Sequence, residues 1–147
     1  MSYWRCHYHL IWTTRQRLSV IDSLREGIIG RCVSSISDAE KIELHAVGVV
    51  EDHVHIAVSI PPRLSVSSVV KLYKGSSSHQ LQKSGAVNLE PWPGWQSEYG
   101  VLTFGDGSFD RIVAYVVRQK EHHRDETLWP AMEQVRADQS HGNPASP

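Results

Sequence analysis

The chain has 147 residues, 40% of them hydrophobic, and a formal net charge of −1 at pH 7. This length is expected to form one globular domain. Two cysteines without zinc-ligand spacing argue against a disulfide scaffold and indicate a reducing compartment. We find no signal-peptide pattern and no apolar run that could cross a bilayer, so we expect a cytoplasmic protein that does not enter a membrane. The near-neutral charge argues against a generally basic nucleic-acid binder.

Positive charge is nevertheless concentrated in two stretches. No acidic residue precedes Asp22, and the stretch 53–89 also contains none. The candidates for contacts with an anion in these stretches are Arg15, Arg17, Lys71 and Lys74. Charge alone does not distinguish a phosphate-binding surface from ordinary solvated side chains.

The hydrophobic pattern predicts seven elements in the order β-α-β-β-α-β-α. They cover residues 4–14, 21–38, 42–50, 53–60, 64–83, 95–104 and 109–123. The first six elements match the split β-α-β pattern. We therefore expect an α+β fold of the ferredoxin-like (RRM-like) class, an antiparallel sheet with helices on one face and an additional C-terminal helix. The domain should span residues 1–124, followed by a polar tail over residues 125–147.

The strand at residues 53–60 alternates cleanly with period two. One face is aliphatic and suits packing against helices. His53 and His55 lie on the opposite face with small neighbours, which leaves room for a ligand. Imidazole is the commonest metal ligand, although two half-exposed strand histidines are the simpler interpretation of such a pair. A second pair, His7 and His9, lies on the first strand and competes as a candidate.

The last predicted helix carries Tyr115 and Gln119, four residues apart and so on one face. A buried aromatic residue and a solvated glutamine are the ordinary interpretations. Together with His53 and His55, however, the amide oxygen would complete a neutral, open ligand set for a divalent cation. The phenol would then lie one helical turn from the third ligand.

At this point the chain resembles a known family. The segments that carry the resemblance are residues 8–17, 52–62, 69–81, 95–104 and 115–123. They resemble the motifs of the single-tyrosine HUH transposases of small bacterial insertion sequences (the TnpA type) and of their domesticated relatives associated with repetitive extragenic palindromes. HUH denotes His, a bulky hydrophobic residue and His, here His53, Val54 and His55. The sequence departs from the family pattern at Glu51, where proline is expected.

The resemblance implies a transposase that cleaves and rejoins single-stranded DNA through a 5′-phosphotyrosine intermediate. Tyr115 would be the nucleophile, and His53, His55 and Gln119 would hold Mg²⁺ or Mn²⁺. His9 would belong to the first-strand motif and not to the metal site. The family also implies subterminal DNA hairpins as the substrate and a homodimer with composite active sites.

Two alternatives belong to other functional classes. One is a domesticated module that binds a DNA hairpin without cutting it. The other is a metal-dependent phosphodiesterase that uses water as its nucleophile, which would not need Tyr115. The presence of Tyr115, Gln119 and both metal-site histidines favours the transposase.

Overall fold

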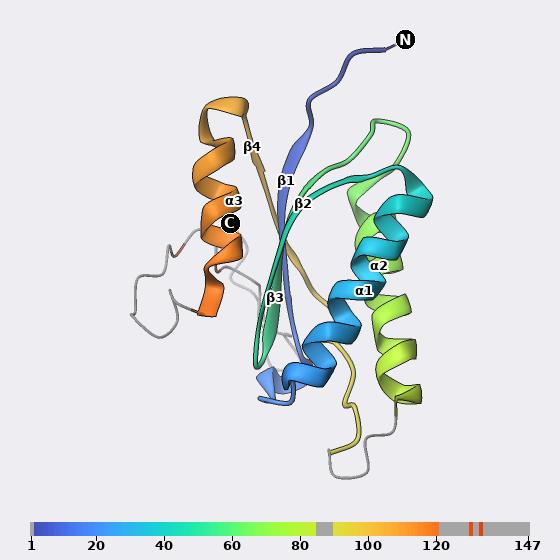
Figure 1. The fold of residues 1–147 in the computed structure, drawn as a ribbon. Coiled ribbons are helices and arrows are strands. Elements are labelled where there is room, and N and C mark those ends of the chain that lie inside the picture. Colours follow the sequence, from blue (N-terminus) through green and yellow to red (C-terminus); the bar gives the residue numbers. More distant parts are fainter. Residues whose placement is uncertain (1, 85–89, 121–129, 131–132, 134–147) are drawn as a thin grey trace, which may run out of the picture.

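The computed structural model describes residues 2–84, 90–120, 130 and 133. Its strands are β1 (His7–Thr13), β2 (Glu43–Val50), β3 (His53–Ser59) and β4 (Gly100–Phe104), and its helices are α1 (Ser23–Glu40), α2 (Val66–Lys83) and α3 (Phe109–Val117). Two 3-10 turns, η1 (Arg15–Arg17) and η2 (Asp106–Ser108), precede α1 and α3. The four strands form one antiparallel sheet in the order β2-β3-β1-β4 (Figure 1). The predicted α+β, ferredoxin-like fold is confirmed.

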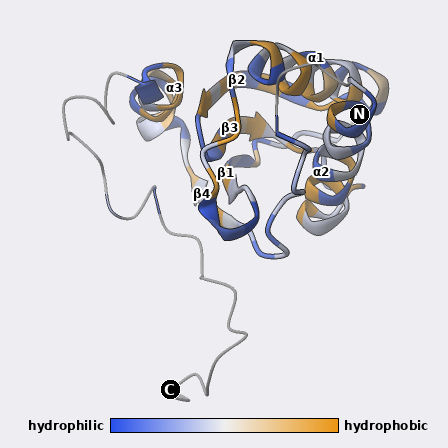
Figure 2. Ribbon diagram, turned by 90° about the horizontal axis from the view of Figure 1, so that it is seen from below, coloured by the Kyte–Doolittle hydropathy of each residue, from blue (hydrophilic) through white to orange (hydrophobic). Residues whose placement is uncertain are grey.

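The main core lies between the sheet and the helices α1 and α2 (Figure 2). Alternation along β1 and β3 places Leu10, Trp12, Val54 and Ile56 on this face, all with 0% exposure. The histidines of these strands therefore lie on the other face. None of the helices in the described part of the chain combines the length and apolarity that crossing a membrane requires.

The serine run of α2 supports the aromatic part of this core. Ser77 Oγ accepts a hydrogen bond from Trp95 Nε1 at 3.0 Å, and Ser78 Oγ accepts one from Trp92 Nε1 at 3.1 Å. The Tyr73 hydroxyl shares a 2.8 Å hydrogen bond with Ser37. Buried indole and phenol groups need such partners, which explains why small polar residues replace aliphatic ones here.

The fourth strand is shorter than the predicted 95–104. Trp95 makes only an isolated bridge with Thr14, and continuous pairing begins at Gly100. Lys74 donates to the carbonyls of residues 96–98, the nearest at 2.6 Å. A lysine side chain therefore satisfies backbone groups that a neighbouring strand would otherwise satisfy.

Helix α3 lies on the opposite face of the sheet, against β2 and β3 (Figure 1). It also ends earlier than predicted, at Val117, and residues 121–123 lie outside the described residues. Gly48 on β2 permits its close approach. A Cβ atom at this position would lie 2.0 Å from the carbonyl oxygen of Val116 and 2.8 Å from Gln119 Cγ.

Replacing Gly48 with alanine should therefore displace α3 from the sheet. Relieving an overlap with rigid backbone should cost about 1–3 kcal/mol. We expect faster hydrogen exchange in residues 109–120, with the strands β1 and β3 still protected. Gly30→Ala in α1, where an added Cβ has no neighbour within 4 Å, is the matched control. Unchanged exchange of α3 in Gly48→Ala would contradict this packing.

Candidate metal and tyrosine site

The predicted histidine pair is buried beneath α3. His53 and His55 are 2% and 0% exposed, and their ring centroids are 5.0 Å apart. Both rings point to the face away from α1 and α2 because they alternate with the core residues of β3. The structure thus brings together the pair that the sequence analysis selected.

Each ring of the pair has its Nδ1 atom engaged by a neighbouring side chain. His53 Nδ1 lies 2.6 Å from Asp52 Oδ1, and His55 Nδ1 lies 2.7 Å from His9 Nε2. The Nε2 atom, on the other side of each ring from Nδ1, faces one oxygen of Glu133 in both histidines. The distances from Oε2 are 3.4 Å to His53 Nε2 and 3.1 Å to His55 Nε2.

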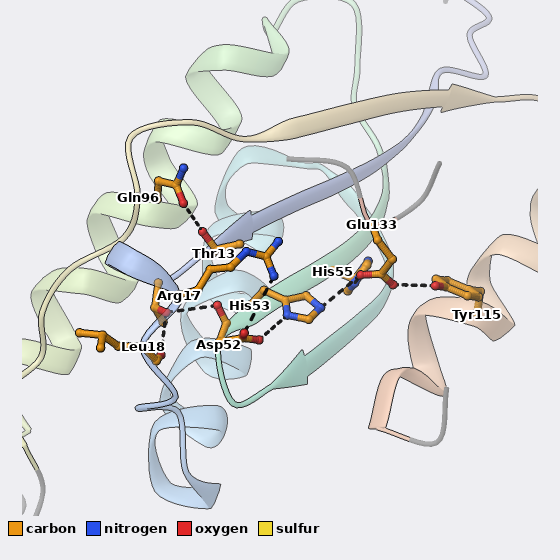
Figure 3. A network of polar contacts seen from close by, with 10 residues as sticks. Thr13, Arg17, Leu18, Asp52, His53, His55, Gln96, Tyr115 and Glu133 are labelled. Carbon is orange, nitrogen blue, oxygen red and sulfur yellow. Dashed lines mark hydrogen bonds and ion pairs between the residues drawn. The ribbon is translucent and has the colours of Figure 1, made fainter. Parts of the chain in front are cut away.

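Glu133 also contacts the tyrosine of α3. Tyr115, which is 1% exposed, donates its hydroxyl hydrogen bond to Glu133 Oε1 at 2.6 Å. Figure 3 shows the carboxylate between the histidine rings and the phenol. Sequence reasoning missed Glu133 and assigned its region to a polar tail. Nothing in the local sequence distinguishes this glutamate from other acidic residues nearby, because its contacts are with residues far away in the chain.

Gln119 follows the end of α3 and is 1% exposed. Its Nε2 donates to the Tyr115 carbonyl at 3.0 Å, a backbone acceptor left open where the helix ends. This contact leaves the Oε1 atom buried, with no hydrogen-bond partner among the described residues. The side chain packs over Gly48, which pairs directly with His55. Gln119 therefore packs over the strand neighbour of His55 with an acceptor that no described residue engages.

The titratable groups of the site shift one another's pKa values. Burial lowers the pKa of His53, but Asp52 and Glu133 on either side outweigh it and hold that pKa above its usual value. Burial raises the pKa of Glu133, while hydrogen bonds from the two histidines and Tyr115 lower it well below the usual range. For His9, burial and then the neighbouring His55 lower the pKa to about 3, so this imidazole is neutral at pH 7.

The side chains present suit a divalent cation. Ligand atoms of His53, His55 and Glu133 all lie within 4.8 Å of one another, so this group could hold a metal ion. Gln119, which packs over the strand neighbour of His55, has a buried Oε1 with no hydrogen-bond partner among the described residues and would be a further oxygen donor. Two imidazoles, a carboxylate and an amide form a mixed nitrogen and oxygen set of the kind that Mn²⁺ and Mg²⁺ accept.

The four predicted phosphate contacts occupy different places. The exposed Arg17 lies at the rim of the site, with its Nη1 4.0 Å from Asp52 Oδ2 (Figure 3). Arg15 is exposed on the same turn, and Lys71 is exposed on α2, behind the sheet. Lys74 is partly buried by its contacts with three carbonyls, which engage its ammonium group within the chain.

The competing pair on β1 is divided between two clusters. His7 forms hydrogen bonds with Ser59 Oγ at 2.6 Å and with Asp106 Oδ1 at 2.7 Å. The second one connects β1 to the η2 turn that precedes α3. His9 contacts His55 instead. The two side chains therefore do not form a site of their own.

The fold and this site define a ferredoxin-like domain in which a tyrosine lies beside a buried histidine pair. A family model described as "Transposase IS200 like" matches residues 2–119. The chain belongs to this family of IS200-like transposases. The family suggested by the sequence motifs is thus confirmed.

Individual relatives show the same similarity. The chain is 27% identical over 78 residues to the IS200 transposase of Salmonella typhimurium, which covers 53% of this chain and 51% of that protein. It therefore spans about half the length of that relative. The ISDra2 transposase TnpA of Deinococcus radiodurans is 26% identical over 121 residues, or 80% of this chain and 86% of that protein.

Two solved structures share the fold. One is a protein of Deinococcus radiodurans R1 assigned as a transposase, with 29% identity, a TM-score of 0.62, and coverage of 80% of this chain and 93% of that one. The other is a REP-associated tyrosine transposase bound to a REP hairpin, with 17% identity, a TM-score of 0.61 and complete coverage of both chains. At that identity the second similarity concerns the fold alone.

Proposed function

We propose that this chain cleaves and rejoins single-stranded DNA at transposon ends, with Tyr115 as nucleophile and with a divalent metal ion. One observation carries the proposal. The Tyr115 hydroxyl and the Nε2 atoms of His53 and His55 converge on the two oxygens of the Glu133 carboxylate. A phosphate group bound beside this carboxylate would contact the nucleophile on one side and the metal-binding side chains on the other.

His53, His55 and Gln119 would hold Mg²⁺ or Mn²⁺, with Glu133 as an additional carboxylate ligand. Two imidazoles and an amide are neutral, and the carboxylate supplies the charge and the oxygen donor that hard cations favour. A cation held by these residues would supply Lewis-acid chemistry, which polarises a phosphate and stabilises negative charge on a leaving oxygen. The nitrogen ligands favour Mn²⁺ over Mg²⁺.

Tyr115 would provide the covalent step. An unperturbed phenol has a pKa near ~10, so it attacks well only when its proton has an acceptor. Glu133 Oε1 accepts the hydrogen bond of this phenol, at 2.6 Å. Attack of the phenol oxygen on phosphorus breaks the bond to the 3′ oxygen, which leaves a 5′-phosphotyrosine and a free 3′-OH. Because the ester retains the bond energy, another 3′-OH can rejoin the strand without ATP.

The substrate would be a single strand with a hairpin near the transposon end. The REP-bound structure with the same fold supports this choice, since that protein holds a DNA hairpin. Arg15, Arg17 and Lys71 are exposed and available for phosphates, whereas Lys74 is engaged by backbone carbonyls. We also propose the cytoplasm as its location, where such a DNA substrate would be available.

The proposal can be tested with end-labelled single strands from the sequence that flanks the gene, in Mn²⁺. We expect cleavage of the single strand but not of its duplex, followed by joining without ATP. Binding of the hairpin without any cleavage would favour the domesticated binding module. Cleavage without joining would favour the water-dependent phosphodiesterase.

The two proposed oxygen ligands, Gln119 and Glu133, should contribute unequally to the affinity for Mn²⁺. Gln119→Ala should weaken Mn²⁺ binding only partly, because water can replace one amide oxygen. Glu133→Gln keeps the size of the side chain but removes its charge, and should weaken binding more. Titration calorimetry without DNA measures both, with the exposed Glu98→Gln as the matched control. Affinity that is unchanged in Glu133→Gln would remove this residue from the ligand set.

The arginines of the η1 turn should contribute to DNA affinity. Charge reversal of Arg15 and Arg17 should weaken hairpin binding and make its salt dependence shallower, because fewer phosphates are neutralised. Reversal of Lys41, exposed at the end of α1, is the control. The assignment fails if affinity and salt slope both stay at the wild-type values in the double variant.

The family also leads us to propose a homodimer with composite sites. Within one chain, the Tyr115 and His55 ring centroids are already 6.1 Å apart. A single chain could therefore also form the site with its own tyrosine. The two arrangements differ in which chain supplies the tyrosine.

A further inference from the structure

His9 lies directly behind the metal-site histidine His55. It is on β1, the strand next to β3, and it is 0% exposed. Its Nε2 atom is 2.7 Å from His55 Nδ1, and the two ring centroids are 4.9 Å apart. The family motifs place His9 in the first strand and give it no part in the ligand set.

The contact determines which nitrogen of His55 can bind a cation. A metal ligand uses a lone pair, so His55 must carry its proton on Nδ1 when Nε2 binds the metal. That N–H group points at His9 Nε2, which must then accept its hydrogen bond. When Nε2 of His55 instead carries the proton and donates to Glu133, His9 Nε2 can become the donor. A neutral imidazole can serve in both arrangements, whereas a carboxylate or an aliphatic side chain cannot.

The burial of His9 is not explained by stability alone. Its other nitrogen, Nδ1, is buried and has no hydrogen-bond partner among the described residues. An unsatisfied buried polar atom destabilises a fold, and an aliphatic residue would fill the same space without one. His53 differs, because its Nδ1 partner is the carboxylate of Asp52.

We propose that His9 is a positioning residue that orients the His55 ring and accepts a hydrogen bond from its Nδ1–H group when Nε2 binds the metal. The proposal rests on the metal site of the proposed function. It adds a residue that touches neither metal nor DNA, on a different strand from the ligands.

The test uses two variants of His9 and one matched control. His9→Leu removes the acceptor, and His9→Gln restores one through its side-chain oxygen. His7→Leu alters another buried histidine on the same strand, which contacts Ser59 and Asp106 instead of His55. We expect Mn²⁺ affinity, measured by calorimetry without DNA, to fall about 10–100-fold in His9→Leu. It should recover substantially in His9→Gln and stay at the wild-type value in His7→Leu.

A spectroscopic measurement on the wild-type chain makes the test independent of whether His9→Leu folds. Nitrogen-15 NMR of the protein loaded with diamagnetic Mg²⁺ or Zn²⁺ should show the His55 proton on Nδ1. A proton on Nε2 in the loaded protein would overturn the proposal, as would wild-type affinity in folded His9→Leu. If the wild-type chain binds no metal, the proposed metal site itself fails, which is a distinguishable result.

Discussion

His53→Ala and His55→Ala are each expected to abolish DNA cleavage and metal binding while the fold persists. Both side chains project from the face of β3 opposite the aliphatic core, so that core is untouched. Loss of a direct ligand should reduce Mn²⁺ affinity by more than the about 10–100-fold typical of residues that only support a ligand. Calorimetry, cleavage of a labelled strand and circular dichroism should be measured on the same preparations.

His45→Ala is the matched control for these variants. His45 lies on β2, where the pairing with β3 is irregular, and its Nε2 is 2.6 Å from Ser59 Oγ. It contacts neither Glu133 nor the histidine pair in any described interaction. We expect it to retain metal binding. Loss of metal binding in His45→Ala with retention in His53→Ala would show that the site has been assigned to the wrong histidines.

Tyr115→Phe is expected to abolish strand cleavage and to leave metal binding intact. The substitution keeps the ring and its packing but removes the hydroxyl that donates to Glu133. Without that oxygen no phosphotyrosine can form. Tyr73→Phe is the matched control, because Tyr73 is also fully buried and loses one hydrogen bond, to Ser37, on the other side of the sheet. Cleavage that persists in Tyr115→Phe would favour water as the nucleophile.

Mixing these two inactive proteins tests the assembly. In composite dimers, a heterodimer of His53→Ala with Tyr115→Phe contains one site in which His53 and Tyr115 are both intact. Some activity should therefore return. A mixture that stays inactive although heterodimers form would indicate that each chain supplies its own tyrosine, as the contacts within the single chain allow.

The fold could be predicted because its strands carry strong alternation. The face of β3 that holds the histidines followed from period two alone. Helix faces were less well determined. In the helix predicted over residues 21–38, apolar residues at spacings of four (Leu24, Ile28, Cys32 and Ile36) predict one buried face, but Leu24 is 48% exposed. Each step of four residues rotates about 40° around a helix, so a stripe built this way drifts off the buried face after a few steps.

Tyr115 and Gln119 were predicted as site residues because their spacing matched a motif. Glu133 and the role of His9 depend on contacts between distant segments, and no local pattern encodes such contacts. His9 Nε2 meets His55 across 46 residues of sequence, and Glu133 meets His55 across 78. The start of β4 was predicted too early for a similar reason. Lys74, on α2, donates to the backbone carbonyl of Gln96 in place of a neighbouring strand.

The most direct test of the account is to identify the residue that becomes attached to DNA. A single strand labelled on the 3′ side of the cut should be incubated with the chain and Mn²⁺, digested with protease and analysed by mass spectrometry. We expect a denaturation-resistant adduct in which the 5′ phosphate of that 3′-side fragment is esterified to Tyr115. Cleavage with no adduct, or an adduct at any other residue, would contradict it.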